Sequence, residues 1–153
     1  MVVIQRSCGY MMRPSLSVDE IGEICKFVKE INPNCICYID NCYGEFTDTK
    51  EPIEVGADII AGSLIKNPGG GIAPTGGYIV GRKDLVELAS YRMTSPGMGA
   101  ELGASLANNR LLFQGLFLAP HVVAQAVKSA IFAAAFFDLL GFKTLPAPDT
   151  KKK

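Results

Sequence analysis

The sequence predicts an α/β fold, a mostly parallel sheet with flanking helices, on three observations. Short apolar runs rich in β-forming residues occupy residues 2–4, 36–39 and 59–62. Between the first two runs lies a segment whose apolar residues recur at helical spacing, and this alternation is typical of a parallel sheet. An acid and a lysine then follow consecutive runs, as Asp40 and Lys66. At 153 residues the chain can form one domain with a proper core.

The first helix is predicted from its start signal. Ser17 is the expected N-cap, and Glu20, three residues later, completes a capping box. Apolar residues at helical spacing then define one stripe that is expected to face the sheet. These residues are Ile21, Ile24, Phe27, Val28 and Ile31. The sequence Asn-Pro-Asn at 32–34 ends the helix.

The remaining strands follow from the apolar runs. Residues 35–39 are expected to form a strand that delivers Asp40 at its end. Residues 44–49 form a polar loop before the strand at 59–62. A glycine-rich stretch at 67–77 then turns the chain into a strand at 78–80.

Two helices are predicted in the second half, at 83–91 and 120–140, with Gly141 as a helix stop. The apolar run at 130–137 is interpreted as part of a buried helix. The alternative is an apolar surface that parts outside this chain would cover. The run is shorter than the roughly 20 residues that span a bilayer.

Asp40 and Lys66 are the chemically informative pair. Strand ends in an open α/β sheet face one crevice, so both side chains are expected to meet there. A carboxylate can keep a pyridine nitrogen protonated, and a lysine amine can form a Schiff base with an aldehyde. The pair is the arrangement that a pyridoxal 5'-phosphate (PLP) enzyme needs. A surface lysine and a loop or helix-cap acid are the structural alternatives.

Four phrases carry a more specific signal, namely residues 5–7 (QRS), 40–46 (DNCYGEF), 62–71 (GSLIKNPGGG) and 114–121 (QGLFLAPH). Their order and spacing resemble the methionine γ-lyase-like family, also called aluminium-resistance proteins, which is related to the cystathionine β/γ-lyases. The resemblance implies the large domain of a PLP-dependent transferase of fold type I, the aspartate aminotransferase-like class. In that class the strand after the lysine often runs antiparallel to its neighbours.

The resemblance also implies a domain assignment. Members of the family are far longer than 153 residues, so residues 1–146 are expected to be part of a PLP-binding large domain. Residues 147–153 are expected to be a disordered polar tail. The family's phosphate-binding glycine loop, its ring-stacking aromatic residue and its carboxylate-binding arginine have no counterpart in this sequence.

Roles for individual residues follow from the same resemblance. Lys66 would form the Schiff base and Asp40 would hold the pyridine nitrogen. Ser63 matches a position whose hydroxyl binds the cofactor phosphate, with a turn serine as the alternative. Tyr43 stands where the lyases have an aromatic residue, which packs behind the cofactor. Two further candidates for contact with the cofactor ring or the substrate, equally compatible with packing or a surface salt bridge, are Arg6 and Tyr10.

The implied activity is that of a PLP-dependent carbon–sulfur lyase. It would catalyse β- or γ-elimination from a sulfur-containing amino acid of the cystathionine or methionine type through a Lys66 Schiff base. Two alternatives stay open: a catalytically inactive, truncated fragment of such an enzyme, and an α/β module that binds a phosphate ligand non-covalently. Whether the chain by itself is an enzyme is therefore left open. The family also implies a homo-oligomer, either a dimer or a tetramer.

Composition excludes several other classes. Lysine plus arginine equals aspartate plus glutamate at 15 each, so no overall field attracts nucleic acid or an anionic membrane. No signal peptide is visible. The five cysteines are odd in number and lack the paired spacing of a zinc site, so no metal site is predicted. Unpaired cysteines fit a reduced, cytoplasmic setting.

Overall fold

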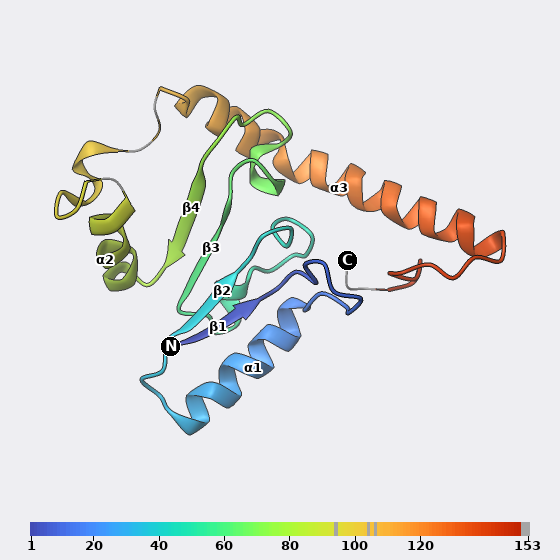
Figure 1. Ribbon diagram of the computed structural model, residues 1–153, viewed down its shortest axis with the longest axis horizontal. Helices are drawn as coiled ribbons and strands as arrows, with labels where there is room; N and C mark the ends of the chain where they lie inside the picture. Colours follow the sequence, from blue (N-terminus) through green and yellow to red (C-terminus); the bar gives the residue numbers. More distant parts are fainter. Residues whose placement is uncertain (94, 104, 106, 151–153) are drawn as a thin grey trace.

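The sheet has four strands in the order β1-β2-β3-β4 (Figure 1). They are β1 (Val2–Gln5), β2 (Cys37–Asp40), β3 (Ile59–Ser63) and β4 (Gly77–Gly81). The first three run parallel, and β4 pairs antiparallel with β3. This computed structural model describes residues 1–93, 95–103, 105 and 107–150. The predicted mixed α/β sheet, including the reversed direction of residues 78–80, is confirmed.

Helix α1 (Val18–Ile31) begins as its capping signal predicts. The Glu20 backbone N–H donates to Ser17 Oγ at 3.2 Å, and the Ser17 backbone N–H donates to Glu20 Oε2 at 2.9 Å. These bonds satisfy N–H groups that have no partner within the helix. The helix start is therefore fixed by four residues of local sequence.

The predicted apolar stripe of α1 is only partly correct. Ile21 and Cys25 are buried, and Val28 packs beside them, but Phe27 and Ile31 are 61% and 70% exposed. At about 100° per residue, Phe27 lies about 120° around the helix from Ile21. The buried stripe therefore runs through Ile21, Cys25 and Val28, and one of its residues is a cysteine.

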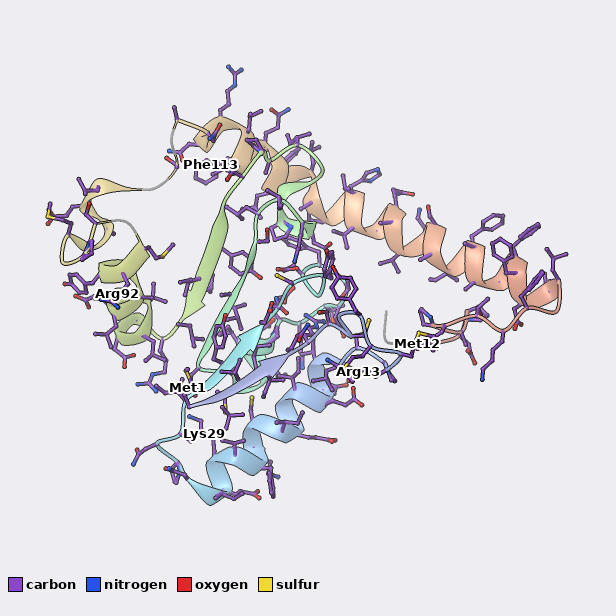
Figure 2. The ribbon with its side chains drawn as sticks, viewed as in Figure 1. Met1, Met12, Arg13, Lys29, Arg92 and Phe113 are labelled. Atoms are coloured by element: carbon purple, nitrogen blue, oxygen red, sulfur yellow. The ribbon has the colours of Figure 1, made fainter. Side chains whose placement is uncertain are left out.

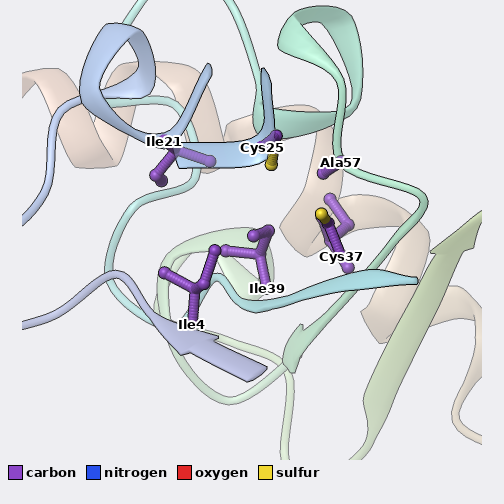
Figure 3. Packing of buried hydrophobic residues seen from close by; sticks show 7 residues of the cluster. Ile4, Ile21, Cys25, Cys37, Ile39 and Ala57 are labelled. Atoms are coloured by element: carbon purple, nitrogen blue, oxygen red, sulfur yellow. The ribbon is translucent and has the colours of Figure 1, made fainter. Parts of the chain in front are cut away.

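The core lies between α1 and one face of the sheet (Figure 3). Ile4, Ile39 and Ile60 project from β1, β2 and β3 toward Ile21 and Cys25. Successive residues of a strand point to opposite faces, so the residues next to these isoleucines point away from α1. The outward-facing positions include Asp40, the last residue of β2.

Helix α2 (Lys83–Met93) agrees with its predicted start and extends slightly beyond the predicted end. Helix α3 (Asn109–Leu139) starts much earlier than the predicted residue 120. Pro120 lies inside this helix, although proline is favoured in the first turn of a helix.

The prediction that residues 130–137 are buried is wrong. Phe132 is 72% exposed, and Phe136 and Phe137 are each 49% exposed. The outer half of α3 extends beyond the sheet, and its side chains project from the helix (Figures 1 and 2). The most apolar 18-residue window of α3 has a mean hydropathy of 1.6, and 6% of that window is buried. By length and composition α3 could cross a membrane. Core helices of soluble proteins pass the same test.

The inner part of α3 is held by small residues. Gly115, Ala119 and Val123 are its buried residues, one turn apart along the helix. Gly115 faces the backbone of Gly69, in the short 3-10 helix η2 (Asn67–Gly69) that follows Lys66. A Cβ at Gly115 would collide with the backbone of Gly69, and a Cβ at Gly69 would collide with the carbonyl of Leu64. Backbone-to-backbone contact therefore joins α3 to the Lys66 turn.

The chain after α3 folds back toward β1. Residues 147–150 form a turn in which the Thr150 backbone N–H donates to the Ala147 carbonyl at 3.0 Å. Residues 151–153, the rest of the predicted polar tail 147–153, lie outside the described residues.

Candidate active site

Asp40 ends β2 at the carboxyl edge of the parallel strands. It pairs in register with Ala61 of β3, and Ser63 lies two residues farther along β3 on the same face. The Asp40 carbonyl accepts from the Arg6 backbone N–H at 3.0 Å, and its side-chain Oδ1 accepts from the Cys42 N–H at 3.1 Å. The carboxylate is thus held at the strand end, on the face away from α1.

Lys66 follows the end of β3 in a tight turn. Its backbone N–H donates to the Ser63 carbonyl at 3.3 Å. Its Nζ lies 4.3 Å from the centroid of the Tyr43 ring, a cation–π arrangement. Tyr43 adopts a φ of 68°, in the left-handed region, and its side chain is exposed.

Cys42 connects the acid and the lysine. Its backbone N–H donates to Asp40 Oδ1 at 3.1 Å, and its thiol is close enough to both Asp40 and Lys66 for each of them to affect its pKa. Burial lowers the pKa of Lys66, but Cys42, Tyr43 and Asp40 together outweigh it and raise that pKa. Burial is the largest cause that raises the pKa of the Cys42 thiol, and Asp40 raises it further. Lys66 acts in the opposite direction and lowers it. In this state the site holds an ammonium beside a neutral thiol and a carboxylate.

Ser63 lies between the two elements of the site. It is half-buried, and its Oγ accepts from the Ile65 backbone N–H at 3.4 Å. A hydroxyl that accepts one bond still has a proton to donate. The structure therefore brings Asp40, Ser63, Lys66 and Tyr43 to one edge of the sheet, as predicted.

Arg6 and Tyr10 are placed differently. Arg6 is 5% exposed, and its Nη1 donates to Asn41 Oδ1 at 2.8 Å while its Nη2 donates to Thr47 Oγ1 at 3.4 Å. Its guanidinium is engaged inside the protein, and burial lowers its pKa even though Glu51 opposes that shift. Tyr10 is fully exposed on the loop after β1.

A cleft of about 540 Å³ borders the site. Cys42 and Tyr43 form part of its wall, together with the loop after β1 and the C-terminal turn. The other wall residues include Arg6, Ser7, Ser17, Val127 and Thr150. Asp40, Ser63 and Lys66 are not among its walls, so the predicted pair lies beside this cleft.

Sequence reasoning missed several buried polar residues beneath the site. Asn41 is fully buried, and Glu45 is 4% exposed although it lies in the predicted polar loop. The only available signal was their position in the phrase DNCYGEF, because a polar residue in a loop is ordinarily exposed. Among the described residues, no group of three or more metal-ligating side chains is present.

The chain matches the family model described as methionine gamma-lyase over residues 1–153. It is 58% identical over 149 residues to a Bacillus subtilis protein named as uncharacterized protein YnbB, covering 97% of this chain and 35% of that protein. It is also 26% identical over 90 residues to the L-methionine gamma-lyase of Treponema denticola, covering 59% of this chain and 22% of that enzyme.

Solved structures show the same fold. A Listeria innocua protein described as a candidate cystathionine beta-lyase involved in aluminum resistance matches with a TM-score of 0.94 and 59% identity. A carbon-sulfur lyase involved in aluminum resistance from Clostridium novyi matches with a TM-score of 0.91 and 53% identity. Each match covers 97% of this chain, which spans only 36% and 35% of those two chains.

Proposed function

The chain belongs to the methionine gamma-lyase family, and on that premise we propose that it carries the lysine and acid half of a PLP site in a carbon–sulfur lyase. One observation carries the proposal. Asp40 and Lys66 come from the ends of adjacent parallel strands and contact the same two-residue segment, Asp40 through the Cys42 N–H at 3.1 Å and Lys66 through the Tyr43 ring at 4.3 Å. Had they faced opposite sides of the sheet, no cofactor of that size could have touched both.

The chemistry of these residues fits the cofactor. Asp40 is a carboxylate on the open face of the sheet, suited to hold a protonated pyridine nitrogen. Lys66 offers a primary amine, and Ser63 offers a neutral hydroxyl donor for a phosphate. Ile65 provides no second hydroxyl beside the lysine, so further phosphate donors would have to come from elsewhere. PLP, when bound, supplies an electron sink for negative charge that develops at the substrate α-carbon.

Asp40 and Lys66 have different roles in the proposed reaction. Asp40 supplies the fixed negative charge, and Lys66 is the group that accepts and returns a proton at the substrate α-carbon. Lys66 can accept a proton only as the free amine, whereas Cys42, Tyr43 and Asp40 now raise its pKa. Weaker contacts with these neighbours in the loaded site would favour the free amine. The Tyr43 ring contact, on an exposed side chain, is the contact most easily exchanged.

The remaining parts of this proposal concern the longer protein. The chain spans about a third of the length of the relatives above, so the substrate and assembly belong to a protein of that length. We propose a small sulfur-containing amino acid as the substrate, with β- or γ-elimination as the reaction. The fold is proposed to be the large domain of fold type I, in a cytoplasmic homodimer or homotetramer.

The experiment uses the 153-residue chain as it stands. It is mixed with PLP, reduced with borohydride and digested, and the pyridoxyl mass is located by peptide mass spectrometry. Selective labelling at Lys66, with the label lost in Lys66→Ala, is the expected result. Lys83→Ala is the matched control, because Lys83 is an exposed lysine at the start of α2.

A second variant tests the acid. Asp40→Asn keeps the shape of the side chain and removes its charge, so it is expected to weaken PLP binding while leaving the fold intact. Labelling spread evenly over surface lysines would contradict a covalent site at Lys66. Saturable protection of the chain by PLP or phosphate without any label would instead favour the non-covalent phosphate-binding module.

A further inference from the structure

A buried polar cluster lies directly beneath the candidate site. We define it as Arg6, Asn41, Glu45, Glu51 and Tyr78. Arg6 follows β1, Asn41 follows β2, and Tyr78 belongs to β4, while the two glutamates lie in the segment between β2 and β3. Three of the five are less than 6% exposed, which is rare for a guanidinium and a carboxylate unless both are well paired.

Most polar atoms of the cluster are paired. Asn41 Oδ1 accepts from Arg6 at 2.8 Å, and Asn41 Nδ2 donates to Glu51 Oε2 at 3.0 Å and to Tyr78 Oη at 3.3 Å. Tyr78 Oη in turn donates to Glu45 Oε1 at 2.6 Å. Glu51 receives a further bond from Arg6 at 3.5 Å. The guanidinium charge is therefore already balanced by Glu51.

Glu45 is the exception. Its Oε2 is buried and has no hydrogen-bond partner among the described residues. The charged or titratable groups near it are Arg6, Glu51 and Tyr78, and burial raises the pKa of Glu45 despite the Tyr78 bond and the attraction of Arg6. An ionised Glu45 would leave a net negative charge inside the protein, which is costly. Protonation of Glu45 would remove that net charge.

Glu45 also touches both halves of the site. The Asn67 side chain, next to Lys66, donates to the Glu45 backbone carbonyl at 2.9 Å, a bond that substitution of the Glu45 side chain does not remove. A Cβ at Gly62, next to Ser63, would meet the Glu45 carboxyl group and would lie 2.5 Å from a Tyr78 ring carbon. Through the Tyr78 hydroxyl, Glu45 is linked to Asn41, the residue that follows Asp40. The Glu45 side chain therefore packs near the end of β3 and is linked through Tyr78 to the residue after β2.

We propose that Glu45 is a positioning residue, whose buried carboxyl group keeps the Asp40 strand end and the Lys66 turn at a fixed separation. Its relevance to catalysis rests on the proposed function. Its structural part stands without any cofactor. Glutamine reproduces the shape of a neutral glutamic acid and can accept the Tyr78 hydrogen bond, whereas alanine cannot.

The first measurement is the thermal midpoint of unfolding against pH for the wild type, Glu45→Gln and Glu45→Ala. Because burial raises the folded-state pKa of Glu45 above its unfolded value, its stabilisation is complete below the unfolded pKa and is lost as pH rises through the folded pKa. Glu45→Gln is expected to lack this loss. Glu45→Ala is expected to be less stable at every pH, and Glu23→Gln, on the exposed face of α1, to match the wild type.

The second measurement is the rate of reductive methylation of Lys66 in the native, cofactor-free chain, followed by mass spectrometry. Loosening the turn would release Lys66 from the neighbours that raise its pKa, so Glu45→Ala is expected to speed its labelling. The expected increase is roughly two- to twelvefold, the factor for one lost hydrogen bond. Glu45→Gln is expected to keep the wild-type rate, and labelling of the exposed Lys26 serves as the internal reference.

Two results would overturn the proposal: Glu45→Gln behaving like Glu45→Ala, or Lys66 labelling unchanged in Glu45→Ala. If the alanine variant does not fold, Tyr78→Phe replaces it, because it removes the hydroxyl that links Glu45 to Asn41 and keeps the ring. It is expected to speed Lys66 labelling in the same way, and an unchanged rate would overturn the proposal. Neither measurement contains PLP, so a failure here is distinct from a failure of PLP to label Lys66.

Discussion

The contact between Gly115 and Gly69 gives the sharpest stability prediction. A Cβ added at Gly115 would lie 2.8 Å from the Gly69 carbonyl carbon and closer still to its oxygen, whereas ordinary contacts begin at 3.4 Å. The obstruction is backbone, so no side chain can rotate away. Helix α3 would have to retreat from η2 by roughly 1 Å, which would loosen the contacts of Ala119 and Val123 as well.

The magnitude is a balance of two terms. Replacing glycine by alanine inside a helix gains about 1 kcal/mol of helix propensity. Overpacking of a rigid contact costs about 1–3 kcal/mol, and a backbone obstruction places Gly115→Ala at the upper end. The expected net loss is about 2 kcal/mol, which corresponds to a drop of about 4–8 °C in the midpoint of unfolding for a chain of this size.

Urea denaturation followed by far-UV circular dichroism measures the free energy of unfolding directly. The control is Ser129→Ala, on the exposed side of α3, where only a bond from Ser129 Oγ to the Gln125 carbonyl is lost. It is expected to stay within about 0.5 kcal/mol of the wild type. A Gly115→Ala variant as stable as the wild type, or more stable, would refute the close packing of α3 on the Lys66 turn.

The other predictions concern an ion pair and the outer part of α3. Asp58 accepts from Lys29 Nζ at 2.7 Å, and although burial raises the pKa of Asp58, Lys29 and its other partners outweigh this and lower it. Asp58→Asn is therefore expected to lower the thermal midpoint of unfolding at neutral pH. The difference in midpoint from the wild type is expected to disappear as pH falls through the folded-state pKa of Asp58. A pH series of melting curves would check this. The exposed rings of Phe132 and Phe136 are expected to drive self-association; sedimentation velocity should show less of it in a Phe132→Ser/Phe136→Ser variant, whereas Phe27→Ser, on α1, should leave it unchanged.

Local signals in the sequence predicted much of this fold. The Ser17 and Glu20 capping box fixed the start of α1, and the apolar runs located the strands, because both depend on residues close together in the chain. The meeting of Asp40 with Lys66 could also be anticipated, since adjacent parallel strands present their ends at one edge.

Other features could not be predicted because they depend on residues far apart in sequence. From the sequence alone Glu45 is interpreted as an exposed loop residue, because its hydrogen-bond partner Tyr78 is 33 residues away. The exposure of Phe132 could not be decided either, since an apolar helix has the same sequence whether another element covers it or not. The early start of α3 was hidden by Pro120, which ordinarily marks a first turn.

The order of the strands along the chain also bears on how the molecule folds. The acid and the amine come from consecutive strands, β2 and β3, whose connection contains only one short 3-10 helix, Pro52–Val55. These parallel strands can pair only after residues 41–58 have closed into a loop, and such non-local pairing is intrinsically slow. We therefore expect the two chemical groups to meet only when the sheet itself forms, in a slow step of folding.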